Sequence, residues 1–171
     1  AMPGRLIREL TEASRIVGGI DEESALLAKE LYSSFSRGEI ITTDAATSEV
    51  VKLVENTYRD VNIAFANEAA VICGGMGVDF HRVRELVNGL PHVEGEPRLD
   101  PYRRVHFPGA GVGGHCLPKD PWLLLHGHED EDFPPRLIPA ARTVNDAMPG
   151  QMKRLIVDAL GEQGVILSKA R

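Results

Sequence analysis

The sequence predicts a mainly α-helical fold built on one long core helix, preceded by a short strand–helix–strand piece. Apolar residues recur at helical spacing over 47–73, which indicates the long helix. Apolar runs at 15–20 and 39–43 flank a helical stretch at 21–36, which indicates the strand–helix–strand piece. Two further helical stretches, at 79–88 and about 135–160, make most of the remaining chain helical as well.

The first 45 residues are expected to form the tail of an α/β unit. Asp21 follows the first strand, where a helix N-cap is needed. One such piece cannot make a nucleotide-binding sheet alone, and the fingerprint G-x-G-x-x-G after an N-terminal strand is missing. Residues 1–4 resemble part of a loop and 164–167 begin a strand-like run, so both ends of the chain look cut.

Capping and breaking residues predict where the later helices begin and end. Asp44 or Thr47 is the expected cap of the long helix. Asp79 caps the shorter helix, which runs through Asn88. Pro149 is expected to kink or interrupt the last helical tract, because proline removes a backbone donor from a helix interior.

One face of the long helix carries polar residues. Lys52, Asn56 and either Arg59 or Asp60 follow one another at about one-turn intervals, so they share a face. A lysine and an asparagine one turn apart can converge on a ligand, whereas charges at this spacing also mark an ordinary solvated face.

Composition limits the class of protein. With 171 residues, 43% of them hydrophobic, the chain can bury the core of one domain or slightly more. It has two cysteines in unlike surroundings, no apolar signal-peptide region and no run long enough to span a membrane. We therefore expect a soluble protein of the reducing cytoplasm without a membrane partner.

The net charge and its distribution also limit the possible partners. The formal net charge of −6 argues against a general nucleic-acid surface. A local basic cluster suits a small phosphorylated ligand, and a solvated basic loop explains it equally well; it comprises Arg98, Arg103, Arg104 and His106.

The glycine-rich run over 108–122 has the layout of a reactive site. Asp120 and Pro121 are the expected N-cap and first residue of a short buried helix, whose positive end faces the loop. That helix end and the ammonium of Lys119 both favour the thiolate of Cys116, the nucleophilic form of cysteine. Four glycines in six positions permit positive φ angles and a close approach to a ligand; they are Gly109, Gly111, Gly113 and Gly114.

Two other roles for the cysteines are considered. Free cysteines are often small buried hydrophobic residues, and Cys73, at the apolar end of the long helix, is expected to serve packing. Cys116 with His126 and His128 offers three metal ligands, but without a fourth and at a spacing that matches no standard zinc pattern. We therefore predict no metal site.

Two distant motifs resemble those of the UDP-glucose/GDP-mannose dehydrogenase family. They are Glu-Asn-Thr-Tyr-Arg-Asp-Val-Asn-Ile-Ala at 55–64 and Gly-Ala-Gly-Val-Gly-Gly-His-Cys at 109–116. The residues of these two motifs look most like those of the UDP-N-acetylmannosamine dehydrogenase branch. Val-Gly-Gly-Ile at 17–20 and Ala-Arg-Thr-Val-Asn-Asp-Ala-Met-Pro at 141–149 also look familial, so the resemblance extends over nearly the whole chain.

The resemblance implies a three-part enzyme of polysaccharide biosynthesis, of which this chain holds mainly the middle. Residues 1–45 would be the C-terminal remnant of an NAD-binding Rossmann domain. Residues 46–148 would be the helical central domain, which forms the dimer and carries the cysteine. Residues 149–171 would be a linker helix toward an absent C-terminal nucleotide-binding domain.

The resemblance also implies a reaction and roles for individual residues. Members oxidise the C6 alcohol of a nucleotide sugar to a carboxylate with NAD, through an adduct on a cysteine. Cys116 matches that nucleophile, and Lys52 the lysine that stabilises oxyanion charge. Asn56 matches the residue that helps to hold substrate oxygen and water, and Asp120 the acid/base aspartate.

Further positions are carried over for ligand contacts. Lys119 matches a cofactor-side lysine found after the cysteine in UDP-glucose members. Arg59, with Arg103 or Arg104, is assigned to phosphate or sugar contacts that reach a neighbouring subunit's site, and Gly113 is assigned to the substrate.

A homodimer is expected through the helix at 47–73, with its contact near Ala64, Phe65 and Ala66. A purely internal core helix is the alternative. Because the fingerprint for the cofactor is missing, these residues alone are expected to act as a non-catalytic dimerisation module with negligible turnover.

Overall fold

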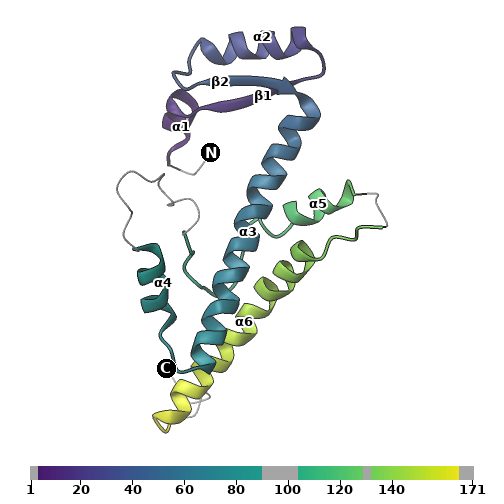
Figure 1. Ribbon diagram of the computed structural model, residues 1–171. Coiled ribbons are helices and arrows are strands. Elements are labelled where there is room, and N and C mark those ends of the chain that lie inside the picture. Colours follow the sequence, from purple (N-terminus) through teal and green to yellow (C-terminus); the bar gives the residue numbers. More distant parts are fainter. Residues whose placement is uncertain (1–3, 90–103, 129–131, 166–171) are drawn as a thin grey trace, which may run out of the picture. The chain divides into compact units, whose positions relative to one another are not determined.

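The structure is a computed structural model that describes residues 4–89, 104–128 and 132–165. Its contacts divide the chain into two compact units, Ala1–Glu55 and Asn56–Arg171, and the helix α3 (Ala45–Gly75) belongs to both. Figure 1 shows the elements of each unit. The prediction of a mainly helical fold with one long helix is confirmed.

The first unit contains a strand–helix–strand crossover, as predicted. Strands β1 (Arg15–Gly19) and β2 (Ile40–Asp44) are parallel, with Arg15 opposite Ile40 and Gly19 opposite Asp44. Helix α2 (Glu22–Ser33) connects them and lies along the strand pair (Figure 1). The core of this first unit is formed by three buried apolar side chains, Val17, Ala25 and Ile40.

Local contacts fix the start of α2. The Asp21 carboxylate accepts a hydrogen bond from Ser24 N at 2.7 Å, and the Ser24 hydroxyl accepts one from Asp21 N, which completes a capping box. Hydrogen bonds from the backbone and the side chain of Ser24 to the carboxylate lower the pKa of Asp21. Gly19 is required by packing, because a Cβ there would lie 2.5 Å from Ala25 N.

Helix α1 (Leu6–Glu12) was not predicted from the sequence. It has no side-chain cap and no buried residue, so neither a capping signal nor a core-facing stripe marks it. Its Thr11 carbonyl accepts a hydrogen bond from Arg37 N at 2.6 Å, which ties it to the loop before β2.

Asp44 is the residue that caps α3. Its carboxylate accepts hydrogen bonds from Thr47 N at 2.8 Å and from the Thr47 hydroxyl at 2.6 Å, and these bonds lower its pKa. Of the two expected caps, Asp44 is therefore correct and Thr47 is its partner. The helix runs without a break to Gly75, two residues beyond the predicted end.

In the part of the second unit that the structure describes, three further helices follow α3. Helix α4 (Phe80–Asn88) is capped by Asp79, as predicted. Helix α6 (Leu137–Glu162) lies along α3 (Figure 1) and is joined to it by buried hydrogen bonds. The predicted interruption at Pro149 is wrong, because α6 continues through it.

Helix α5 (Asp120–His126) departs from the sequence prediction in two ways. Lys119 occupies the N-cap position, so Asp120 is the first helical residue rather than the cap. Trp122 and Leu123 were expected to be buried, but both are about half exposed. The side chains of α5 that are buried are Asp120 and Pro121, at its start.

Most of the buried side chains of α3 are polar, and the apolar ones among them are two alanines. Asn56, Asp60 and Asn67 are all at most 7% exposed, so the solvated-face interpretation is wrong for Asn56 and Asp60. Ala64 and Ala66 are buried within the chain, which removes both from the predicted dimer contact.

The opposite face of α3 carries an apolar stripe that stays exposed. Its members fall within roughly a quarter of the helix circumference and are between 46% and 64% exposed; they are Val50, Val54, Tyr58, Phe65 and Ile72. None of the described helices is both long and apolar enough to cross a lipid bilayer.

Candidate functional site

The segment that leads into the glycine-rich loop is fastened to α4. The Asn88 side chain exchanges two hydrogen bonds with the backbone of Val105, at 2.9 and 3.0 Å. The guanidinium of Arg84 lies 3.5 Å from the ring centre of Phe107, and the His81 ring contacts the same ring. These contacts with α4 therefore hold the backbone in place just before the glycine-rich loop.

The first glycines of the loop lie against α3 and α6. Gly109 N donates to the Asn67 side-chain oxygen at 2.8 Å. Gly111 has φ of +100°, and a Cβ there would lie 2.6 Å from the backbone oxygen of Asn145. Both the left-handed backbone and the close approach require glycine at position 111.

Cys116 lies where the loop enters α5. Its carbonyl accepts hydrogen bonds from Asp120 N at 2.9 Å and Lys119 N at 3.1 Å, so its backbone belongs to the turn that begins the helix. The residue is a free thiol and is partly exposed. Cys116 is thus partly exposed on a backbone that these hydrogen bonds hold.

Asp120 joins this turn to α3. Its carboxylate is 6% exposed and accepts a hydrogen bond from the Asn56 amide at 2.6 Å. Its other oxygen accepts one from the Lys119 ammonium, also at 2.6 Å. The structure thus brings together three of the predicted site residues around the turn that carries the fourth, Cys116.

Lys119 is drawn to the carboxylate more than to the thiol. The hydrogen bond to Asp120 raises the pKa of Lys119, and the charges of Asp120 and Cys116 add to the rise, against a loss of hydration. The ammonium is more than half exposed, which leaves it accessible to a ligand.

Among the described residues, the remaining predicted site residues are exposed. Lys52 is exposed and pairs with Glu55 at 2.8 Å. Arg59 and Arg104 are exposed. Gly113 is exposed with open space where a Cβ would lie. Arg103 and Arg98 lie outside the described residues.

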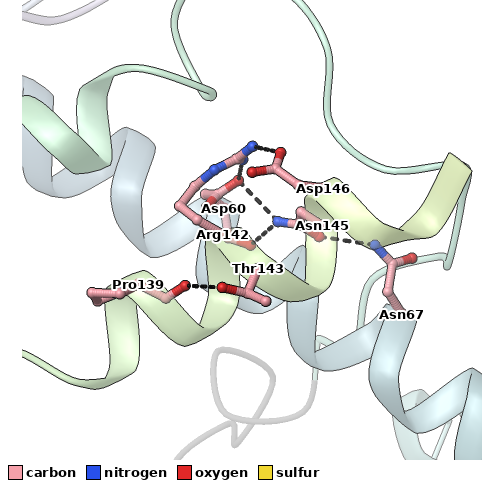
Figure 2. A network of polar contacts seen from close by, with 7 residues as sticks. All are labelled: Asp60, Asn67, Pro139, Arg142, Thr143, Asn145 and Asp146. Atoms are coloured by element: carbon pink, nitrogen blue, oxygen red, sulfur yellow. Dashed lines mark hydrogen bonds and ion pairs between the residues drawn. The ribbon is translucent and has the colours of Figure 1, made fainter. Parts of the chain in front are cut away.

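Figure 2 shows a buried polar network beside the loop, which sequence reasoning missed. The Asp60 carboxylate accepts hydrogen bonds from Arg142 at 2.6 Å and from the Asn145 amide at 2.9 Å. The Asn145 side-chain oxygen accepts one from the Asn67 amide at 2.9 Å. Arg142 also pairs with the exposed Asp146.

The available signal for this network was the polar composition of one helix face. Asn56, Asp60 and Asn67 repeat on a single side of α3. The partners of Asp60 and Asn67 lie on α6, about 80 positions away in the sequence, and the partner of Asn56 is Asp120 of α5, 64 positions away. Periodicity alone could not distinguish a buried polar face from a solvated one.

The metal alternative finds no support in the described residues. No group of three or more His, Cys, Asp or Glu side chains is arranged there to hold a metal ion. A ring nitrogen of His128 lies 3.0 Å from the carbonyl oxygen of Phe133, which accounts for that imidazole.

Residues 46–147 match the model of the UDP-glucose/GDP-mannose dehydrogenase family, central domain, which is more than half of the chain. The chain belongs to the UDP-glucose/GDP-mannose dehydrogenase family. The resemblance inferred from the two motifs is therefore confirmed, and the matched residues run from the start of α3 into the first part of α6.

Curated relatives within the family are similar along nearly the whole chain. The chain is 47% identical to the UDP-N-acetyl-D-mannosamine dehydrogenase of Pyrococcus horikoshii, over 99% of this chain and 37% of that protein. It is 39% identical to the UDP-N-acetyl-D-mannosamine dehydrogenase of Campylobacter jejuni, over 99% of this chain and 39% of that protein. The chain thus spans well under half the length of these dehydrogenases.

Solved structures agree in fold. The P. horikoshii UDP-D-ManNAc dehydrogenase superposes with a TM-score of 0.81 at 45% identity, over 96% of this chain and 36% of that chain. The NDP-N-acetyl-D-galactosaminuronic acid dehydrogenase of Methanosarcina mazei gives 0.81 at 42% identity, over 96% and 35% of the two chains.

The arrangement of the site can support addition to a carbonyl followed by hydrolysis. It offers an accessible thiol, a buried carboxylate that can exchange protons, and an exposed ammonium beside them. These are the groups that a dehydrogenase needs when it carries an alcohol beyond the aldehyde.

Proposed function

We propose that this chain is the catalytic central part of an NAD-dependent nucleotide-sugar 6-dehydrogenase, which oxidises the C6 alcohol of a UDP-sugar to a carboxylate. UDP-N-acetylmannosamine is the first candidate substrate, because the similar proteins carry that activity in their names. UDP-glucose is the second. The observation that carries the proposal is the Asn56–Asp120–Lys119 cluster on the turn of Cys116.

The described residues of this chain do not fit the dinucleotide by themselves. Gly18 and Gly19 end a strand, but a Cβ at either would meet backbone atoms within 3 Å, so they serve packing rather than a phosphate. We assign the binding of NAD to other parts of a longer protein, with Lys119 as its contact from this chain. When bound, NAD accepts a hydride in each of the two oxidations.

Cys116 makes and breaks one bond to carbon. Its thiolate adds to the C6 aldehyde, so that a C–S bond forms and the carbonyl electron pair moves to oxygen, which gives the alkoxide of a thiohemiacetal. Oxidation of that adduct gives a thioester, and water then displaces the thiolate, which leaves the carboxylate. Overall, one alcohol, one water and two NAD⁺ give one carboxylate, two NADH and three protons.

Asp120 and its neighbours handle protons and charge. Asp120 takes a proton from the attacking water, and its bond to Asn56 holds the carboxylate in place for this role. Lys52 stabilises oxyanion charge; its exposed pair with Glu55 is worth at most about 1 kcal/mol, so the ammonium is easily redirected to a ligand.

The substrate contacts are proposed on Arg59, Arg104 and Gly113, which are exposed, and on Arg103, which lies outside the described residues. Arg59 and Arg104 are exposed cations suited to phosphate or sugar oxygens, and Arg103 is the third candidate. Open space at Gly113 allows a ligand to approach the backbone there.

A homodimer through α3 is also proposed, with a corrected contact surface. The exposed stripe of α3 is apolar, which suits burial against a second copy of the same helix. Phe65 remains from the predicted contact, and Tyr58 and Ile72 join it at seven-residue spacing on the same side.

The test is NADH formation by the full-length protein with UDP-N-acetylmannosamine, UDP-glucose, UDP-N-acetylglucosamine and GDP-mannose. A Cys116→Ser variant is expected to lose turnover, while Cys73→Ser, which changes the other free thiol, is expected to keep it. Full activity of the Cys116→Ser variant would remove the nucleophile assignment. NADH formation by the 171-residue chain alone would contradict its role as a dimerisation module without turnover.

A further inference from the structure

Two buried asparagines join the loop to the helices, and each can take only one amide orientation. Asn67 receives a hydrogen bond from Gly109 N, a pure donor, so its oxygen must face the loop and its nitrogen must face Asn145. The Asn145 nitrogen faces two acceptors on Asp60, the carbonyl at 3.0 Å and the carboxylate at 2.9 Å. The hydrogen bonds therefore run in one direction, from Gly109 of the loop to Asp60, and Figure 2 shows the part from Asn67 to Asp60.

The far end of this chain of hydrogen bonds is rigid. Asp60 is fully buried and Arg142 is 2% exposed, and their ion pair of 2.6 Å holds the carboxylate that receives Asn145. Asn67 and Asn145 are at most 1% exposed, so water cannot replace a bond that is lost.

Pro149 supplies a second contact between α6 and the loop. Proline has no N–H, so the carbonyl of Asn145, four residues earlier, loses the donor that position 149 would otherwise supply. This same carbonyl lies against Gly111, whose added Cβ would come within 2.6 Å of its oxygen. A helical proline thus coincides with the place where the loop meets the helix.

We propose that Asn67, Asn145 and Pro149 form a docking point that fixes the backbone at 109–111 and so positions Cys116. As a positioning device the docking point rests on the proposed function, because the reaction is what demands an accurately placed thiol. From 111 the chain reaches Cys116 in five residues, and the Asn56–Asp120 bond holds the other end. A displacement of about 1 Å at a reacting atom costs on the order of 100-fold in rate.

Three variants of the full-length protein perturb the docking point from different sides. Asn67→Asp keeps the shape but sets a carboxylate oxygen against the Asn145 oxygen. Gly111→Ala crowds the Asn145 carbonyl, and Pro149→Ala returns a donor to it. Asn62→Asp is the matched control, because Asn62 lies on the same helix and its amide bonds only locally, to the Tyr58 carbonyl.

The readout is the rate of iodoacetamide labelling of Cys116 relative to Cys73, followed by peptide mass spectrometry. Cys73 is an internal reference, since it is a free, partly exposed thiol that belongs to α3 and not to the loop. The three variants are expected to change this ratio and to lower kcat on the order of 10- to 100-fold with a smaller change in KM. Asn62→Asp is expected to leave the ratio, kcat and KM unchanged.

Pro149→Ala separates positioning from stability. Removal of proline from a helix interior favours the helix, so the unfolding temperature is expected to stay or to rise while the labelling ratio changes and kcat falls. An unchanged ratio in all three variants would overturn the proposal. An equal rise at both thiols would overturn it as well, because the network would then serve stability alone.

The result is distinguishable from failure of the proposed function. If Cys116→Ser remains active, the nucleophile assignment fails, but the labelling ratio still reports whether the docking point sets the environment of that thiol. If the ratio responds as expected and Cys116→Ser is inactive, both proposals stand.

Discussion

Removal of the Arg142 guanidinium is expected to be the most damaging single change in the second unit. Arg142→Met leaves the Asp60 carboxylate fully buried without its cation. Breaking a buried ion pair in this way costs about 3–5 kcal/mol, out of a total stability of about 5–15 kcal/mol for a typical protein. The pair with Asp146 adds little, because that carboxylate is 63% exposed.

The assay is urea denaturation followed by tryptophan fluorescence. Trp122 is the single tryptophan and lies in α5, so its signal follows the unit that contains the network. For an m value of about 2 kcal/mol per M, a loss of about 4 kcal/mol lowers the midpoint by about 2 M. Arg82→Met is the matched control, since the Arg82–Glu85 pair is exposed and worth at most about 1 kcal/mol.

A double variant tests the cause of the loss. Asp60→Leu with Arg142→Met removes both charges, so it is expected to cost less than the sum of the two single changes. A loss below about 1 kcal/mol for Arg142→Met, or a double variant as unstable as the sum, would refute the reasoning that an unpaired buried charge dominates.

Two further predictions concern carboxylates at the ends of the site and of the sheet. Asn56→Asp sets a second carboxylate 2.6 Å from that of Asp120, and the two cannot both ionise. Relative to wild type, the variant is therefore expected to be less stable at pH 8 than at pH 5. Equal losses of stability at both pH values would contradict this. Asp44 has a pKa lowered by its bonds to Thr47, so its contribution is present above about pH 3.8 and is lost as the pH falls through the lower folded value; acid titration of unfolding should show Asp44→Asn losing less stability between pH 6 and pH 2 than wild type does.

Local signals predicted the helices and strands that carry their own markers. Asp21 and Asp79 cap α2 and α4 as expected, because a side-chain cap is a contact within three residues. Helix α1 lacks such a cap and was missed. Asp120 was placed one residue too early in its helix, an error of the size that the first turn commonly allows.

The candidate site divides in the same way. Cys116, Lys119 and Asp120 are close in sequence, and their grouping on one turn was predicted from the loop itself. The bond of Asn56 to Asp120 and the network of Asp60 with Arg142 and Asn145 join positions 64 to 85 apart, which no local pattern encodes. For the same reason, the sequence did not predict that the polar face of α3 is the buried one.

The two ties between α3 and the loop explain why that loop is rich in glycine. Asn56 and Asn67 lie about 16 Å apart along the helix axis, at about 1.5 Å per residue, and they hold the loop at Asp120 and Gly109. Fully extended, the loop between those points would reach about 36 Å. The extended length of the loop is thus roughly twice the distance between its two attachment points. The excess length requires the loop to bend sharply within a few residues. Gly111 and Gly114 have positive φ angles, which allow the sharp bends that this excess requires, and Cys116 lies two residues after the second of them.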